Sequence, residues 1–566
     1  MDSSVKKKVN EMLQRLDNDS LAISMADPVA KMMLVVLAHE TEGIERQIDS
    51  SVERLSERFV NKVLTNNGLS PQPAIGLLKI DNGKEYTSYT IDEKIAFSHK
   101  ISKCNYRPLL PTRIVPGTLV AYYANGMLHF PYGDTVGIQH GDMVHPDELW
   151  IAYDAAGELE TLADLIIAVN HPLENPRHLT AHVGKRAFEL RPVMEESLYA
   201  VGDDFMMMEY WKRHLVFHRL WLYRFVPDNS DMPLMTSSMP DWFYDMYEAA
   251  TLSRLTSSRL VWIKITNGKK LDVPADSHME FNCVPVANFD INTVKLSYTE
   301  PIKPLDNPRD NSQYYSVVPD NELADEFFVR DFDVEQYDNS RIADDIQNLY
   351  RHYINDYFAF IDSNSLTDGV VLRNLRMSML QVTDALDDIS KVSKPYAGSY
   401  IIRTPRNNNL PIAVSYVTTQ GMRGNMLRSG EKLSISFAAT GEVISLVDAV
   451  GGRDKITGSI GKKELARLIV NSDSRIYSEI DLLQYCRVEL IRALGEDALR
   501  HCEIKFSHKT IPVGNHIEKA MVVTLTFTSD RLYSMAKNIN LQDYLSLNTS
   551  LRYSSGEATE FVIELE

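Results

Sequence analysis

The sequence predicts a multidomain α+β protein in which long N-terminal helices form a coiled-coil or bundle core. Two patterns carry this prediction. Apolar residues recur at helical spacing through residues 28–64, and from residue 74 onward short runs of β-branched and aromatic residues alternate with turn residues. The length of 566 residues suits about three or four domains of ordinary size. After the N-terminal helices we expect β-rich middle domains, a helical hairpin and a small C-terminal α+β domain.

The first predicted region, residues 1–73, contains a short amphipathic helix followed by a long one. Asp27 and Pro28 mark the start of the long helix, because aspartate favours the N-cap and proline the first helical position. Residues 28–64 would extend about 55 Å, a length that one globular core cannot cover, so the apolar stripe should pack against other helices. The predicted interface residues of this stripe are Val29, Met33, Leu37, Ile44, Ile48, Val52, Leu55, Phe59 and Val63.

The second region, residues 74–335, is expected to be β-rich with helical insertions, in one or two domains. Six segments have the residue content of short strands. Helical patterns interrupt them at residues 206–225 and 242–253. The predicted strands are residues 74–80, 86–91, 113–115, 119–123, 149–153 and 259–265.

The third region, residues 336–394, is predicted to form an antiparallel helical hairpin. Apolar stripes mark both arms, and Asp368 with Gly369 supplies the turn between them. Ile346, Tyr353 and Tyr357 on the first arm complete the predicted protein interface.

The fourth region, residues 395–566, is expected to be an α+β domain. A strong helical pattern runs from Ser478 to Leu494 and stops at Gly495. The strands predicted around it are residues 399–403, 412–418, 432–437, 503–507 and 521–528.

Composition argues against several classes of function. Lys plus Arg number 59 and Asp plus Glu 77, so a formal net charge of −18 repels nucleic acid and anionic lipid. Cys104, Cys283, Cys486 and Cys502 show no CxxC spacing, which argues against a zinc ribbon or a disulfide framework and favours a reducing compartment. The apolar runs are far shorter than the roughly 20 residues of a membrane-spanning helix, and no signal peptide is recognisable. The sequence therefore predicts a cytoplasmic protein.

Two histidine pairs with HxxxH spacing are the strongest candidates for a metal-binding or catalytic site. They are His178 with His182, and His214 with His218. On a helix each pair would share a face and could bind a metal, but a zincin motif needs glutamate after the first histidine, and both pairs have leucine there. Ordinary surface or half-buried histidines are the favoured interpretation. A metal-dependent hydrolase that uses these residues is the alternative function.

Glycine-rich segments offer two further hypotheses, and both fail. In residues 451–463 the first glycine of GxxxxGK would fall at Ile456, and Lys463 stands where a magnesium-binding Ser or Thr belongs. A loop before a helix that starts near Lys462 explains this segment better. Residues 421–424 form a bare GxxG, which is more simply a turn than an RNA-binding loop. The sequence therefore predicts no catalytic, cofactor or metal site and no enzyme.

Trp262, Cys283 and Pro285 are expected to be core or turn residues without chemical roles. Trp262 lies in an apolar run in which Val261 and Ile263 point to the opposite side. Such a run predicts a strand that is covered on both faces.

Four groups of short motifs follow one another between residues 26 and 425. They are A-D-P-V-A at 26–30 with L-S-P-Q-P-A-I at 69–75, E-L-W-I-A-Y-D at 148–154, L-V-W-I-K-I at 260–265 with F-N-C-V-P-V-A-N at 281–288, and V-T-T-Q-G-M-R-G-N at 417–425. Their order and spacing resemble TssF, a baseplate wedge subunit of type VI secretion systems, which is related to wedge proteins of contractile phage baseplates.

The resemblance implies a structural role in a contractile injection machine. TssF-like subunits associate as two copies with one TssG, recruit TssK adaptors and assemble around the VgrG hub beneath the sheath. The chain would then scaffold the baseplate around the hub and prime polymerisation of sheath and tube. The implied partners are a TssG-like subunit, a second copy of the chain, a TssK-like adaptor, a VgrG-like hub spike and sheath-initiator-like proteins, without nucleic acid or membrane insertion. The implied location is the bacterial cytoplasm, at the inner-membrane-associated secretion apparatus.

Overall fold

The structure is a computed structural model of the chain. It describes residues 70–81, 87–131, 134–141, 148–155, 159–173, 179–193, 220–226, 238–255, 260–267, 278–297, 299–318, 326–332, 398–404, 410–435, 441–472, 475–513, 516–552 and 558–566, with five single positions between these ranges. The predicted long helix of residues 28–64 lies outside the described residues, and so does the predicted hairpin of residues 336–394 apart from Met377.

A closed barrel of six described strands forms the centre of the fold, with strand order β1-β16-β4-β3-β23-β24. All of its strand pairs are antiparallel. The pairs β3-β4 and β23-β24 join neighbouring stretches of chain, and the other four pairs join stretches that are far apart in sequence. Leu78, Phe97, Tyr106, Val284 and Val443 belong to the buried cluster inside it. The barrel strands are β1 Ile75–Asp81, β3 Phe97–Ser98, β4 Asn105–Pro108, β16 Cys283–Ala287, β23 Lys432–Ile435 and β24 Glu442–Ser445.

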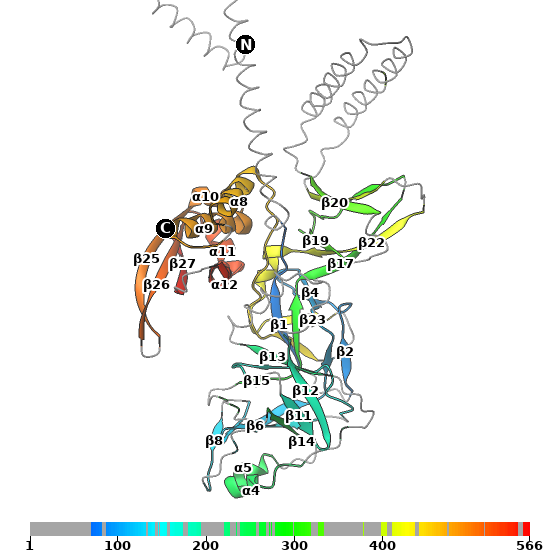
Figure 1. Cartoon of the computed structure of the whole chain (residues 1–566), viewed down its shortest axis with the longest axis vertical. Helices are drawn as coiled ribbons and strands as arrows, with labels where there is room; N and C mark the ends of the chain where they lie inside the picture. The colour runs from blue at the N-terminus through cyan, green and yellow to red at the C-terminus, as the bar shows by residue number, and fades with distance from the viewer. Residues whose placement is uncertain are drawn as a thin grey trace, which may run out of the picture.

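A sheet of ten described strands forms the second large unit, below the barrel in Figure 1. One face covers a large apolar cluster, and the other carries the short helices α4 Phe243–Met246 and α5 Ala249–Ser253. Its strand order is β15-β10-β13-β12-β11-β14-β9-β6-β7-β8. The strands are β6 Thr118–Ala124, β7 Met127–His129, β8 Thr135–Gly137, β9 Leu149–Asp154, β10 Ile166–Val169, β11 Thr180–Val183, β12 Arg186–Pro192, β13 Trp221–Phe225, β14 Leu260–Thr266 and β15 Met279–Glu280.

Strand β14 is covered on both faces, as its sequence predicts. Val261 and Ile263 belong to the cluster on one face, and Trp262, only 2% exposed, belongs to the cluster on the other. The Trp262 ring meets Phe243 of α4 edge to face, with the ring centroids 5.3 Å apart. Cys283 is buried in β16 as well. The prediction that these are core residues is confirmed.

Smaller sheets complete the described β structure. Two sheets of three strands, β17-β22-β19 and β18-β21-β20, share a small apolar cluster that includes Leu296, Ile401 and Val414. A separate pair joins β2 to β5. The bounds are β2 Tyr89–Ile91, β5 Thr112–Ile114, β17 Phe289–Leu296, β18 Ile302–Pro304, β19 Gln313–Val317, β20 Phe327–Phe332, β21 Gly398–Arg403 and β22 Ile412–Thr419.

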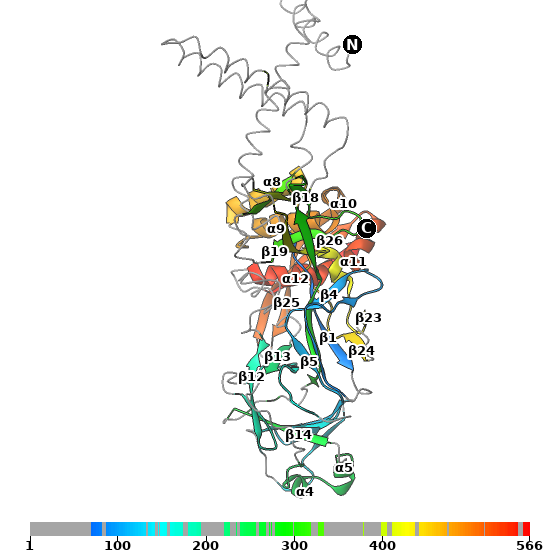
Figure 2. The same cartoon turned by 90° about the vertical axis from the view of Figure 1, so that its right-hand side faces the viewer.

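The C-terminal unit combines five helices of the described chain with a three-stranded sheet (Figures 1 and 2). In this sheet β25 pairs with β26 in antiparallel orientation, and β26 pairs with β27 in parallel orientation. The elements are α8 Ser459–Ser472, α9 Glu479–Leu494, α10 Ala498–His501, β25 Cys502–Val513, β26 His516–Phe527, α11 Asp530–Asn538, α12 Leu541–Arg552 and β27 Ala558–Leu565.

The predicted fold class, an α+β protein with a core of long helices, is wrong. The described residues are mainly β, and their large apolar clusters lie in the barrel, on the ten-stranded sheet and in the C-terminal unit. Helical periodicity is a local signal, whereas a pair such as Ile75 with Ala287 joins residues more than 200 positions apart and leaves no local trace. The coiled-coil assignment receives no support from the described part of the chain.

Two predicted helices of the middle region need correction. Residues 221–225, the end of the predicted helix 206–225, form strand β13, where alternating Leu222 and aromatic residues pack into the sheet. The rest of that segment lies outside the described residues. The predicted helix 242–253 is interrupted at Tyr247, whose extended backbone separates α4 from α5.

No helix among the described residues combines the length and the apolar character needed to cross a membrane.

Helix α9 begins and ends where the sequence predicts. The Ser478 side chain accepts a hydrogen bond from the backbone N–H of Asp481, whose carboxylate accepts one from the N–H of Ser478. This capping box satisfies donors at the helix start. Gly495, with φ of +88°, ends the helix in a conformation that favours glycine.

We expect Ser478→Ala to lower the free energy of unfolding by about 1 kcal/mol, because the N-cap acceptor is lost. Urea denaturation followed by circular dichroism measures this loss. Ser478→Asp is the matched control, since it keeps a cap acceptor and should stay close to wild type. Equal losses in the two variants would contradict a capping role.

Candidate functional site

Three of the motif segments meet at one junction beside the barrel. The backbone N–H of Ala74 donates to Asn288 Oδ1 at 2.5 Å, and the N–H of Asn288 donates to the carbonyl of Ala74 at 2.9 Å. Thr419 Oγ1 donates to the carbonyl of Asn288 at 2.8 Å. Asn288 therefore joins segments that lie 214 and 131 residues away from it in sequence. We call this meeting point, built on residues 71–75, 282–288 and 417–425, the motif junction.

The last of these segments folds into the short 3-10 helix η4, Gly421–Met426, which confirms the predicted turn. Gly421 has a φ of +50°, and any Cβ there would overlap Asp454. A Cβ at Gly424 would overlap the side chains of Asn288 and Ala74. The two glycines of the GxxG are thus required by close packing against the junction.

The four motif groups also include a pair of strands in the ten-stranded sheet. Trp150 of β9 lies opposite Lys264 of β14. Glu148 accepts a hydrogen bond from Trp150 Nε1 at 2.7 Å and forms an ion pair with Lys264. These contacts join the E-L-W-I-A-Y-D and L-V-W-I-K-I segments across neighbouring strands.

Residues 451–458, which we call the strap, connect the motif junction to the C-terminal unit. Asn425 and Gly452 exchange two hydrogen bonds, of 2.8 and 2.9 Å, between the side-chain amide and the backbone. Gln72 and Arg453 exchange two backbone hydrogen bonds of 2.9 Å each. Through these bonds the strap lies against both the first motif segment and the η4 turn.

The side chain of Arg453 extends from the strap into the C-terminal unit. Its Nη2 donates to Glu489 Oε1 of α9, and Tyr544 of α12 donates its hydroxyl to Glu489 Oε2. Arg492 Nε lies 3.8 Å from the same carboxylate. The side chains of Arg453 and Glu489 are only 8% and 1% exposed. Burial alone would lower the pKa of Arg453, but the Glu489 carboxylate outweighs burial and raises this pKa above its usual value.

Asp454, the next residue of the strap, is a buried acid at the base of the η4 turn. Its Oδ1 accepts the backbone N–H of Met422 at 2.9 Å. Burial raises the pKa of Asp454 to about 6, although this hydrogen bond, the Gln313 amide and the charge of Arg492 act in the opposite direction. The carboxyl group therefore gains its proton at a pH where ordinary aspartates are fully ionised.

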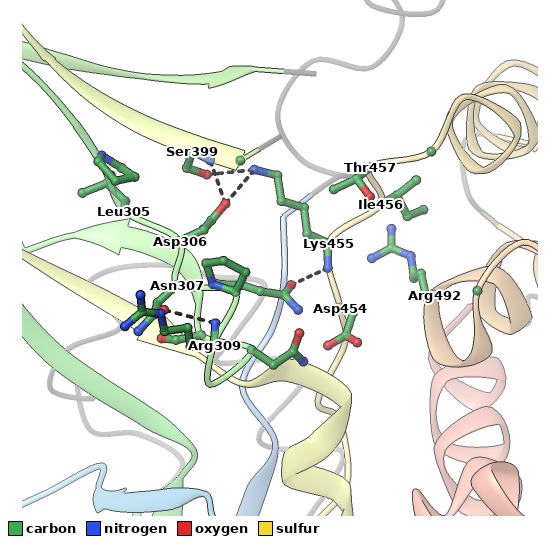
Figure 3. A pocket seen from close by; sticks show the side chains of 18 of the residues that line it. Leu305, Asp306, Asn307, Arg309, Ser399, Asp454, Lys455, Ile456, Thr457 and Arg492 are labelled. Carbon is green, nitrogen blue, oxygen red and sulfur yellow. Dashed lines mark hydrogen bonds and ion pairs between the residues drawn. The ribbon is translucent and has the colours of Figure 1, made fainter. Parts of the chain in front are cut away.

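Lys455 joins the strap to the sheet β18-β21-β20 (Figure 3). Its Nζ lies 2.6 Å from Asp331 and 3.8 Å from Asp306, and it donates to Ser399 Oγ at 2.8 Å. Asp331 is near the end of β20 and Ser399 near the start of β21, so Lys455 ties these two strand ends to the strap.

A cavity of about 980 Å³ opens beside Lys455, between the small sheets and the end of α9. Its walls include Asp306, Arg309, Asp454, Lys455 and Arg492 (Figure 3). Lys455 and Arg492 in the wall have partners of opposite sign. Among the described residues that line the cavity, no serine or cysteine nucleophile stands beside a histidine base. The residues around the cavity thus form a polar contact between the small sheets and the end of α9.

The rejected phosphate-loop hypothesis can be checked at the start of α8. This helix begins at Ser459, three residues before the expected start near Lys462. Glu496 Oε1 accepts the backbone N–H groups of Ile460 and Gly461 at 3.1 and 3.2 Å. A carboxylate of the chain thus occupies the helix N-terminus where a phosphate would bind. The prediction of a loop before a helix is confirmed.

The predicted interface residues cannot be placed in the structure. All twelve lie outside the described residues: Val29, Met33, Leu37, Ile44, Ile48, Val52, Leu55, Phe59, Val63, Ile346, Tyr353 and Tyr357.

The histidine pairs of the alternative function are only partly described. His178, His214 and His218 lie outside the described residues, and His182 lies in strand β11. Within the described part of the chain, no three or more His, Cys, Asp or Glu residues form a group that could hold a metal ion.

Sequence reasoning missed the strap and its buried partners. Glu489 is the best signal that the sequence offered, because it stands between Val488 and Leu490 in a helix whose buried residues, apart from Glu489 and Arg492, carry no charge. A buried acid needs a partner, but the partner Arg453 is 36 residues away and outside any helix.

Comparisons with known proteins find likenesses to solved structures at low similarity. No protein-family model matches the sequence, and no curated protein matches it. A chain of the type VI secretion system TssK-TssF-TssG baseplate subcomplex, determined by cryo-electron microscopy, has 10% identity and a TM-score of 0.38, covering 94% of this chain and 96% of that one. A chain of the baseplate complex from the type VI secretion system has 12% identity and a TM-score of 0.29, covering 98% and 92%. Both chains come from type VI secretion baseplates.

We expect Glu489→Gln to lower the free energy of unfolding by about 3–5 kcal/mol, because Arg453 and Arg492 would stay buried without their countercharge. Urea denaturation of the C-terminal unit, followed by the fluorescence of a probe on α9, measures the loss. Tyr544→Phe removes one hydrogen bond to the same carboxylate and should cost about 1–2 kcal/mol.

The double variant Arg453→Met with Glu489→Met is the matched control for that experiment. Removing both charges leaves no buried ion unpaired within the pair, so it should be less destabilised than Glu489→Gln. A Glu489→Gln protein that unfolds at the wild-type urea concentration would show that this pair contributes nothing to stability.

Because the pKa of Asp454 is raised in the folded state, the stability of the protein depends on pH in a definite direction. The folded state holds this proton more tightly than the unfolded chain, so the contribution of Asp454 to stability is largest below about pH 4 and falls as the pH rises to about 6. A pKa displaced this far changes the free energy of unfolding by about 3 kcal/mol over that range.

We expect Asp454→Asn to gain stability relative to wild type between about pH 4 and pH 6 and to keep that gain at higher pH, because asparagine carries no charge to bury. Urea midpoints of both proteins, measured from pH 4 to pH 8, give the difference and cancel the titration of other groups. A difference that does not change with pH would contradict the assignment.

Proposed function

We propose that the chain is a structural wedge subunit of a type VI secretion baseplate, similar to TssF. In this role it scaffolds the baseplate around the hub and primes polymerisation of the sheath and tube. It works without turnover, through contacts with several partners at once.

One observation carries the proposal. Several residues of the segments that resemble TssF hold the described units together: Asn288, Thr419 and Gly424 at the motif junction, and Asn425, which is bonded to Gly452 of the strap. The resemblance therefore concerns the positions that determine how the units are arranged. A shared arrangement of units is what a shared place in an assembly requires.

The partners proposed for the chain follow from this role. They are a TssG-like subunit, a second copy of the chain, a TssK-like adaptor, a VgrG-like hub spike and sheath-initiator-like proteins, at the cytoplasmic side of the secretion apparatus. Several weak contacts on one rigid body combine through effective concentration, so a ring closes only when all wedges are present. The net charge of −18 opposes indiscriminate self-stacking and favours partners with complementary patches.

The predicted apolar stripe of residues 28–64 supplies the sharpest test at the level of residues. We expect Ile48→Asp to abolish copurification of a TssG-like subunit, because an unpaired charge in a buried stripe costs on the order of 3 kcal/mol or more. Ser50→Asp adds the same charge on the opposite side of the predicted helix and should leave copurification unchanged.

A deletion strain tests the role as a whole. We expect loss of the chain to abolish sheath polymerisation, seen as the absence of sheath structures by fluorescence microscopy, while the amount of sheath protein stays normal. Re-expression of the wild-type chain should restore the sheath. Normal sheath formation without the chain, or normal copurification by Ile48→Asp, would overturn the proposal.

A further inference from the structure

A second cavity, of about 630 Å³, lies between the barrel and the ten-stranded sheet. The barrel contributes the end of β1 and the start of β24, and the sheet contributes parts of β6, β7, β9 and β15. Of the described residues that line it, none belongs to the strap or to the C-terminal unit. Its volume lies within the range of about 300–1,000 Å³ that is usual for small-molecule sites. The cavity is thus large enough for a small organic molecule or for one long side chain of a peptide.

Four of the aromatic rings in the cavity wall form two stacked pairs. Tyr122 stacks on His129 with the ring centroids 4.7 Å apart, and Tyr153 stacks on Phe281 with the centroids 5.1 Å apart. Each of these four residues is at most 4% exposed, so close packing holds the rings in place. Aromatic walls favour a ligand with an apolar body, and the electron-rich ring faces also attract a cation.

His129 brings an unsatisfied nitrogen to the cavity. The residue is only 4% exposed, and its Nε2 has no hydrogen-bond partner among the described residues. A buried polar atom without a partner costs free energy, and a bound N–H donor would remove that cost. Burial also lowers the pKa of His129, so the ring is neutral near neutral pH. A neutral imidazole keeps a lone pair that accepts a hydrogen bond and does not repel a cation.

The charged groups in the wall are mainly acidic. Among the described residues that line the cavity, three carboxylates stand against one lysine, which leaves a net charge of −2 when the histidines are neutral. The carboxylates belong to Asp81, Glu280 and Glu442, and the lysine is Lys79. Glu280 forms ion pairs with both Lys79 and His278, so these basic groups already face a carboxylate. A positively charged ligand complements such a wall, and a negatively charged ligand does not.

From the rings, the unsatisfied nitrogen and the charge of the wall, we infer that this cavity binds an organic cation, an amine or guanidinium with an apolar body. The apolar part lies against the stacked rings, and the N–H groups face His129 Nε2 and the carboxylates. A free small amine and the Lys or Arg side chain of a peptide share this chemistry. The inference goes beyond the proposed function and does not depend on it.

Three probes that share one ring test the charge preference. Benzylammonium carries a positive charge, benzyl alcohol none and phenylacetate a negative one. We expect benzylammonium to bind the full-length chain with a Kd at least about tenfold lower than either of the others, because its charge faces the carboxylates. Saturation-transfer NMR of the probes and isothermal titration calorimetry measure the three affinities.

The variant His129→Phe tests the unsatisfied nitrogen. It keeps an aromatic ring beside Tyr122 and removes the acceptor, so the affinity for benzylammonium should fall about tenfold. The variant should fold normally, since it removes a buried polar atom without a partner, and its urea midpoint checks this. His171→Phe is the matched control: His171 is also a buried histidine, but it does not line the cavity, so binding should stay as in wild type.

The variant Lys79→Met tests the sign of the ligand charge by a gain in affinity. Removing the like charge from the wall should raise the affinity for benzylammonium about threefold or more. The same variant should weaken any binding of phenylacetate. Because Lys79 is 38% exposed, the substitution should leave the barrel folded.

A short peptide distinguishes the two sources of the cation. The probes are the blocked tripeptide Gly-Arg-Gly and free methylguanidinium, which carry the same charged group. Tighter binding of the tripeptide supports the inference with the side chain of a partner protein as the ligand. Equal or weaker binding of the tripeptide, with benzylammonium still bound, supports it with a free small amine.

Three results would overturn the inference. They are equal binding of the three ring probes or preference for phenylacetate, wild-type affinity for benzylammonium in a folded His129→Phe protein, and an unchanged or lowered affinity for benzylammonium in Lys79→Met. The absence of binding by every cationic probe at millimolar concentration would overturn it as well.

Discussion

Arg453 and Glu489 form an ion pair between the strap and helix α9, at a position where neither side chain has appreciable access to water. Two buried charges are costly unless each has its partner, so this contact fixes the distance between the strap and the helix. The backbone of Arg453 is bonded to Gln72, at the beginning of the barrel. One residue therefore connects the barrel, the strap and the C-terminal unit, and the other contacts of the strap depend on its position.

The residues next to Arg453 in the strap extend this connection to the η4 turn and to strands β20 and β21. Gly452 is bonded to the η4 turn through Asn425, Asp454 supports the same turn through Met422, and Lys455 reaches β20 and β21. Four consecutive residues thus hold four separate parts of the described chain. A subunit that must keep several binding surfaces in fixed relation to one another needs such a rigid centre.

The sequence predicted the parts of this fold that depend on local signals. Helix α9 begins and ends as expected because Ser478 and Gly495 act within one turn of it, and the two-sided burial of Trp262 follows from the apolar run around it. The barrel could not be predicted, because its short strands pair across hundreds of residues. The strap was also missed: Gly452, Arg453 and Asp454 form no periodic pattern, and their partners are distant. The motif segments were found as separate signals, but their meeting at Asn288 is a property of the fold.

Native-state hydrogen exchange of the strap tests most directly whether it is the rigid centre of the described fold. The backbone N–H groups of Gln72, Gly452 and Arg453 should exchange with the same free energy of opening as those in the middle of α9 and β1, because the strap can open only when these units separate. Exchange of the strap that is orders of magnitude faster, while α9 and β1 stay protected, would contradict this account, since the units would then hold their arrangement without it.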